Sequence, residues 1–132
     1  MLDVKKLLTK MLTQISTLNS RTTVTTPSIS ISTSTGTLVT TNIRKQGNVV
    51  QLRLTVRNSS SVAAGGNVFT GTISTTALRP VIGVTGGGFY GSHAINGTIG
   101  ADGGITIRNA SSTAVSITGS NTVSVNFTYI VS

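Results

Sequence analysis

The sequence predicts a mainly β protein, with an antiparallel β-sandwich or jelly-roll-like head preceded by a short N-terminal α-helix. Ser and Thr supply 41 of the 132 residues, whereas only 9% of the residues are charged. Because Thr and Val favour strands while Gly and Ser favour turns, this composition favours a β fold. Short segments of alternating polarity recur between turn residues, and the apolar spacing of a helix occurs once, at the start of the chain.

The length suits one hydrophobic core, and the pattern divides the chain into three parts. Residues 1–20 are predicted as an assembly helix, residues 21–46 as a Thr/Ser-rich connector with edge strands, and residues 47–132 as the β head. The chain contains no cysteine, which excludes disulfides and thiolate zinc sites.

The N-terminal segment carries apolar side chains at the a and d positions of a heptad repeat, and Leu7 and Leu12 widen this stripe. Because an isolated helix of this length is marginal in water, something must cover the stripe. We favour a trimeric helical stem, since a broad apolar seam suits a coiled coil of more than two helices. Alternatively, the β domain of the same chain or another protein covers the stripe. The residues assigned to self-association are Val4, Leu8, Met11, Ile15 and Leu18, and Met1 continues the stripe.

The connector and the head show the strand pattern. Pro27 breaks any helix, and residues 28–32 alternate as an exposed strand would. The strongest pattern spans residues 50–57, where apolar residues alternate with polar ones and Arg53 and Arg57 face outward. No helical pattern separates the strands, which argues against a parallel α/β sheet. The same alternation predicts further strands at residues 68–73, 105–107, 115–117 and 123–129.

Few residues could carry catalysis. The chain holds one histidine, His93, and two carboxylates, Asp3 and Asp102, with no glutamate. A nucleophile needs a base, and glycosidic cleavage ordinarily needs two acids at a set separation. The Asp-Gly-Gly sequence at Asp102 suits a turn. We therefore expect a non-enzymatic protein with no catalytic residues, no cofactor and no metal site.

Three glycines, Gly86, Gly88 and Gly91, match the phosphate-cradling pattern G-x-G-x-x-G. That fingerprint needs a following helix and an acid about twenty residues further on, and the sequence offers neither. The pattern is therefore better interpreted as a flexible or closely packed loop than as a dinucleotide site.

The same stretch places Phe89, Tyr90 and His93 close together. Aromatic faces beside polar groups are suited to sugar rings, so this segment is a candidate saccharide contact. Adjacent residues of a strand point to opposite faces, so one of the two aromatic residues should belong to the core.

The formal net charge is +8, which favours an anionic partner. Arg44, Lys45, Arg53 and Arg57 suggest an outer basic face. We expect no nucleic acid there, because a recognition helix and sufficient aromatic platforms are lacking. A solvated face and an anionic-glycan patch are the two interpretations that remain. The candidate ligand-binding residues are Arg53, Arg57, Tyr90 and His93.

The start of the chain also bears on localisation. Asp3, Lys5 and Lys6 interrupt the apolar stretch, so we expect no signal peptide and no export by the ordinary secretory route. No run approaches the roughly 18 apolar residues of a membrane span, so membrane insertion is not expected either.

Three segments, residues 1–12, 97–108 and 125–130, resemble small structural proteins of phages and prophages of Gram-positive bacteria, of the tail-fibre or baseplate receptor-binding kind. The resemblance implies a homotrimer, made in the bacterial cytoplasm and placed in the phage tail beside other tail or baseplate proteins. Three β heads would surround the bundled helices, each recognising a cell-surface polysaccharide or a teichoic-acid-like polymer. No fixed binding motif of that family maps onto these positions. The alternative is a purely structural tail subunit or virion decoration that binds no glycan.

Overall fold

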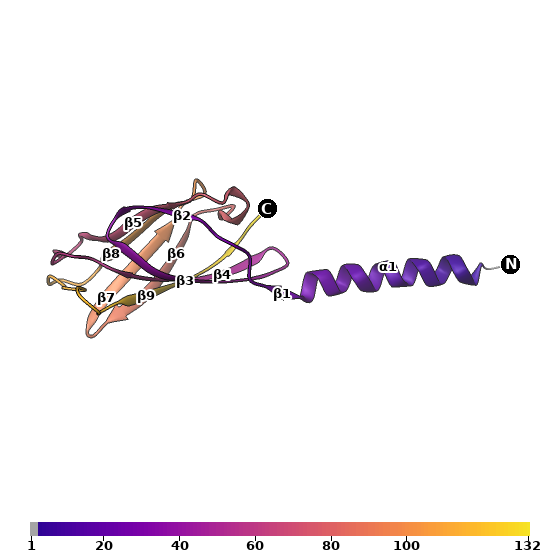
Figure 1. Cartoon of the computed structure of the whole chain (residues 1–132), viewed down its shortest axis with the longest axis horizontal. Coiled ribbons are helices and arrows are strands. Elements are labelled where there is room, and N and C mark those ends of the chain that lie inside the picture. Colours follow the sequence, from indigo (N-terminus) through magenta and orange to yellow (C-terminus); the bar gives the residue numbers. More distant parts are fainter. Residues whose placement is uncertain (1–2) are drawn as a thin grey trace.

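The computed structural model describes residues 3–132, and it describes the side chains of all of these except residues 19–22. Half of the residues lie in strands and 14% in a helix. Helix α1 (Val4–Thr22) projects from a β domain along the long axis of the molecule (Figure 1). This confirms the prediction of a mainly β protein with one N-terminal helix, while the finer assignment to a sandwich or jelly roll stays a prediction.

Helix α1 begins at a local cap. The backbone N–H of Lys6 donates to Asp3 Oδ1 at 3.2 Å, which satisfies one of the free donors of the first turn. The hydroxyls of Thr9, Thr13 and Thr17 each donate to the carbonyl four residues earlier, at 3.0 Å. The helix runs to Thr22, past the expected end at residue 20, because no breaker occurs before Pro27.

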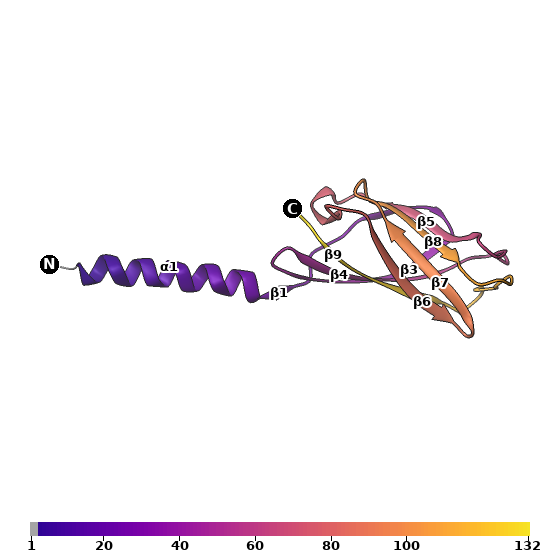
Figure 2. The ribbon, with the colours of Figure 1, turned by 180° about the vertical axis from the view of Figure 1, so that it is seen from behind.

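The strands form one antiparallel sheet that curls around the core. Their order across the sheet is β1-β3-β4-β9-β6-β7-β8-β5-β2. Figure 2 shows the β6–β7 hairpin crossing the domain diagonally, with its tip at the end away from α1. The strand bounds are β1 (Val24–Thr25), β2 (Ile31–Thr35), β3 (Thr37–Gln46), β4 (Val49–Arg57), β5 (Asn67–Ile73), β6 (Val84–Tyr90), β7 (His93–Ile99), β8 (Gly104–Asn109) and β9 (Val123–Ile130).

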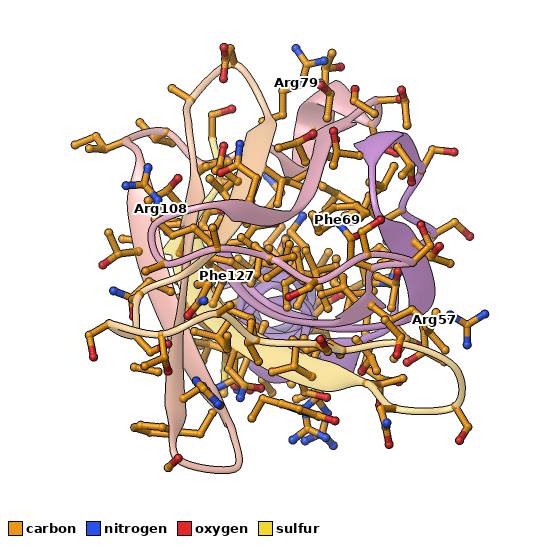
Figure 3. All side chains as sticks on the ribbon, turned by 90° about the vertical axis from the view of Figure 1, so that its left-hand side faces the viewer. Arg57, Phe69, Arg79, Arg108 and Phe127 are labelled. Carbon is orange, nitrogen blue, oxygen red and sulfur yellow. The ribbon has the colours of Figure 1, made fainter. Side chains whose placement is uncertain are left out.

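The core follows from the alternation along the strands. In β4 the apolar side chains of Val50, Leu52, Leu54 and Val56 are at most 1% exposed, as the pattern predicts. The inward residues of β9 pack with them, and those of β5, β7 and β8 belong to the same cluster. Viewed down the long axis, the rings of Phe69 and Phe127 lie inside the domain, whereas Arg57, Arg79 and Arg108 lie at its periphery (Figure 3).

The segment expected to be a connector is part of the sheet. Residues 21–46 include the end of α1 and the strands β1, β2 and β3. The expected edge strands are present, since β1 and β2 lie at the two edges of the sheet. Strand β3 lies one place further in and pairs with β4 from Thr37 to Gln46.

The segment at residues 115–117 does not form the expected strand. Val115 makes an isolated bridge with Val62, and both side chains are buried, as is Ile117. The alternation correctly indicates which side chains are buried, but a single bridge joins this segment to another loop and not to the sheet.

The glycine pattern expected to be a loop lies in the β6–β7 hairpin. Gly91 forms the turn with a positive φ of 59°, whereas close packing explains the other two glycines. Gly86 and Gly88 belong to β6, where an added Cβ would collide with the carbonyl oxygens of Asn126 and Ser124 in β9. At Gly97 in β7, an added Cβ would lie 2.5 Å from Phe127 Cζ. The glycines therefore let the β6–β7 hairpin pack tightly across β9.

The buried phenol of Tyr129 makes the stability of the domain decrease at high pH. Its hydroxyl donates to the carbonyl oxygen of Leu78 at 2.8 Å, and burial raises the pKa of Tyr129 from 10.0 to about 12. Its stabilising contribution is thus fully present below pH 10, and it is lost as pH rises toward 12 because only the unfolded chain releases the proton. We expect the free energy of unfolding to fall by an amount on the order of 2 kcal/mol over this window.

Urea unfolding on either side of this window tests the prediction, with Tyr129→Phe as the control. The variant loses the donor to Leu78, which costs about 1 kcal/mol below pH 10, but its stability should decline less as pH rises. An equal decline in both proteins would contradict the assignment to Tyr129.

Candidate functional site

A groove of about 560 Å³ lies over β3, β4 and β9. Ile43, Leu52 and Phe127 line it, but their side chains are buried in the core, so the neighbouring outward side chains supply most of its chemistry. These outward residues carry guanidinium, amide and hydroxyl groups suited to phosphate and to sugar hydroxyls. They are Thr26, Asn42, Arg44, Gln51, Arg53, Asn126 and Thr128.

Arg53 is held in place across the strands. It is the direct partner of Asn126 in the β4–β9 register, and its Nε donates to Asn126 Oδ1 at 3.1 Å. This bond orients the guanidinium at the groove and leaves its Nη donors for another acceptor. The geometry therefore presents a positioned cation beside an amide.

The groove has no carboxylate among its lining residues. Asp3 caps α1, and Asp102 accepts a hydrogen bond from the backbone N–H of Gly104 at 2.9 Å. The positive charges of Arg44 and Arg53 are thus not neutralised within the groove, which favours an anionic ligand. Arg44 belongs to the basic face predicted from the sequence, whereas the presence of Gln51 and Thr128 in the same groove depends on the pairing of β3, β4 and β9.

Arg57, another predicted contact, does not line the groove. Its Nη1 donates to the carbonyl oxygen of Gly119 at 3.2 Å, which ties the end of β4 to the turn before β9. At least one hydrogen-bond donor of Arg57 is therefore used within the β domain and is not available to a ligand.

The remaining predicted contacts, Tyr90 and His93, lie at the β6–β7 turn, where they pair directly across the hairpin. Neither lines the groove. Tyr90 is partly buried against the core and Phe89 is 75% exposed, which shows which of the two adjacent aromatic residues faces inward. Phe89 is thus the more accessible aromatic contact at this turn.

His93 is part of a hydrogen-bond network whose direction is unfavourable for nucleophilic catalysis. Its Nδ1 lies 3.0 Å from Ser111 Oγ, and two acceptors for the Ser111 hydroxyl, Asn109 Oδ1 and the carbonyl oxygen of Thr113, also lie within hydrogen-bond distance. A hydroxyl has one proton, so with two acceptors beside it Ser111 is placed to accept the N–H of His93. A serine nucleophile needs the opposite direction, in which the histidine accepts the hydroxyl proton.

No protein-family model and no curated protein matches the chain. Within residues 3–132, no helix has the length and apolar character needed to cross a membrane. The same described part of the chain contains no cluster of three or more His, Asp or Glu side chains that could hold a metal ion.

Proposed function

We propose that the protein is a non-enzymatic adhesin of a phage tail, which assembles as a homotrimer through α1 and adsorbs to an anionic cell-surface polysaccharide or teichoic-acid-like polymer. The observation that carries the binding part is the groove, where Arg44 and Arg53 stand among amides and hydroxyls without a carboxylate. Arg pairs readily with phosphate, and the neighbouring polar groups suit sugar or polyol hydroxyls. The place in a phage tail is supported by the sequence resemblance alone.

The helix supports the assembly part. Its described apolar side chains are exposed in the single chain, including Val4 at 71%, Leu8 at 56% and Ile15 at 52%. The β domain of the same chain therefore leaves the stripe uncovered, and burial between copies is a strong source of stability for such a helix. Met11 and Leu18, exposed to 50% and 59%, continue the same stripe, and Met1 lies outside the described residues.

Three heads on one stem would bind a repeating surface polymer with higher avidity than one head, because the second and third contacts become intramolecular. Weak binding at each groove is then sufficient for adsorption. The network around His93 gives no activated nucleophile, which supports binding over catalysis as the function of the head.

Retention on purified Gram-positive cell walls tests this function. At low salt, the double variant Arg44→Ala/Arg53→Ala should bind about a hundredfold more weakly than the wild type, because two charge-assisted contacts are lost. Raising the salt should weaken wild-type binding, since exposed charges are screened within about 10 Å at 0.1 M ionic strength.

The matched control is Lys6→Ala/Lys10→Ala, which removes the same charge from exposed positions of α1. It should be retained like the wild type. Cell walls stripped of their anionic polymers should retain neither the wild type nor this control variant. If the wild type is not retained on walls of any strain, the purely structural role is the better account and adsorption is wrong.

A further inference from the structure

A row of asparagine and arginine side chains crosses the outer face of the curled sheet, perpendicular to its strands. The register aligns one residue from each of seven adjacent strands, and all seven are exposed. We refer to them as the Asn–Arg row. From β3 to β5 they are Asn42, Arg53, Asn126, Gly87, Asn96, Arg108 and Asn67.

The row consists of the same triplet twice. Asn42, Arg53 and Asn126 form the first Asn–Arg–Asn triplet, on β3, β4 and β9, and they line the groove. The second triplet has Arg108 of β8 between Asn96 and Asn67. The two triplets lie on either side of β6, and each presents one guanidinium between two amides.

The fold does not require these residues. Asn is depleted in strands, whereas Thr is favoured there. The adjacent row on the same face shows the fold's usual choice, since Thr85 pairs with Thr98, Thr98 with Thr106, and Thr106 with Thr70. Asparagines at aligned strand positions are therefore better explained by what they bind than by strand formation.

Gly87, between the triplets, also lacks a packing reason. An added Cβ there would meet only the carbonyl oxygen of Ile95, at 4.0 Å, whereas one at Gly86 would collide with the backbone of β9. A side chain would fit at Gly87 without strain. Because Gly87 has no side chain, no side chain projects from β6 between the two triplets.

We propose that the Asn–Arg row is a track for one extended phosphodiester-linked sugar or polyol polymer, which contacts both triplets as it passes over Gly87. Each arginine binds a phosphate, and the flanking amides bind hydroxyls. Arg53 and Arg108 are four strands apart, which corresponds to about 19 Å along the sheet. This inference rests on the proposed adsorption function and names the class of polymer and its path.

The prediction is a dependence on polymer length. A strand of poly(glycerol phosphate) long enough to reach both arginines should bind the full-length protein at least about tenfold more tightly than a short one that spans a single triplet, because the second contact is intramolecular. Fluorescence anisotropy of the two labelled oligomers at low salt measures both affinities.

Arg108→Ala should abolish the preference for the long oligomer while the groove still binds the short one. Gly87→Glu places a negative charge in open space midway along the track, and it should weaken binding of the long oligomer at least about tenfold. Gly87→Gln is the uncharged control of the same size, and it should weaken binding of the long oligomer less. Lys6→Ala, on α1, should leave both affinities unchanged, and thermal unfolding confirms that each variant is folded.

Two results would overturn the track. In the first, Arg108→Ala and Gly87→Glu keep the wild-type preference for the long oligomer while Arg53→Ala loses binding; the groove then acts alone and the proposed function stands. In the second, the wild type binds neither oligomer, and adsorption to this class of polymer fails together with the track.

Discussion

Ile15→Asp should convert the proposed trimer to a monomer. Ile15 occupies an a position of the α1 heptad and is 52% exposed in the single chain, so the apolar area it offers is available for contact between copies. In a parallel trimer the variant would bring three carboxylates together in an apolar layer. Desolvation costs several kcal/mol for each ion, and we therefore expect association to weaken by more than about a thousandfold.

Size-exclusion chromatography with light scattering measures the result, with Thr13→Asp as the matched control. Thr13 is exposed on the polar face of the same helix, so the introduced carboxylate stays in water and the proposed trimer should form as in the wild type. Circular dichroism should show less helix in Ile15→Asp, because a helix of this length is marginal alone. A monomeric wild type, or a trimeric Ile15→Asp, would show that the proposed assembly is wrong.

Asn109→Asp should destabilise the β domain by about 3–5 kcal/mol at neutral pH. Asn109 is fully buried, and its Nδ2 donates to the carbonyl oxygens of Val62, Ala63 and Thr113 at 3.2, 3.3 and 2.8 Å. A carboxylate has no donor for these carbonyls and adds a negative charge beside them. The substitution therefore breaks the contact between the loop before β5 and the loop after β8.

Urea unfolding at neutral and at acidic pH tests this effect. Burial raises the folded-state pKa of the introduced carboxyl above its unfolded-state value of about 3.9. The penalty is therefore largest above the folded-state pKa, decreases as the pH falls from there toward about 3.9, and stays constant at lower pH. Asn48→Asp, the same change at an exposed turn, should alter stability by less than about 0.5 kcal/mol. An equal cost for the two substitutions would contradict the structural role of Asn109.

Several features of the fold could be predicted from local patterns. The burial of Val50, Leu52, Leu54 and Val56 follows from the two-residue period of a strand, which depends only on neighbouring residues. The helix is equally local, since its apolar spacing and the cap at Asp3 lie within a few residues of one another. The composition predicted the β class for the same reason, because propensities act residue by residue.

The candidate site was only partly predictable. Alternation showed that Arg53 faces outward, but its bond to Asn126, 73 residues away, depends on the pairing of β4 with β9. The alternation of a strand likewise requires one of Phe89 and Tyr90 to face inward, but it does not determine which one. The register of the β6–β7 hairpin leaves Phe89 exposed and packs Tyr90 against the core.

A β domain behind an amphipathic helix, a high positive charge and a scarcity of catalytic groups thus follow from the amino-acid sequence alone. The tertiary structure was needed to show that Gly86 and Gly88 of the G-x-G-x-x-G pattern let β6 pack closely on β9, and that Asn42, Arg53, Asn126 and Arg108 lie in one row. The difference arises because the two-residue period of a strand encodes which of its faces is buried, whereas the register between strands distant in sequence results from the packing of the whole core.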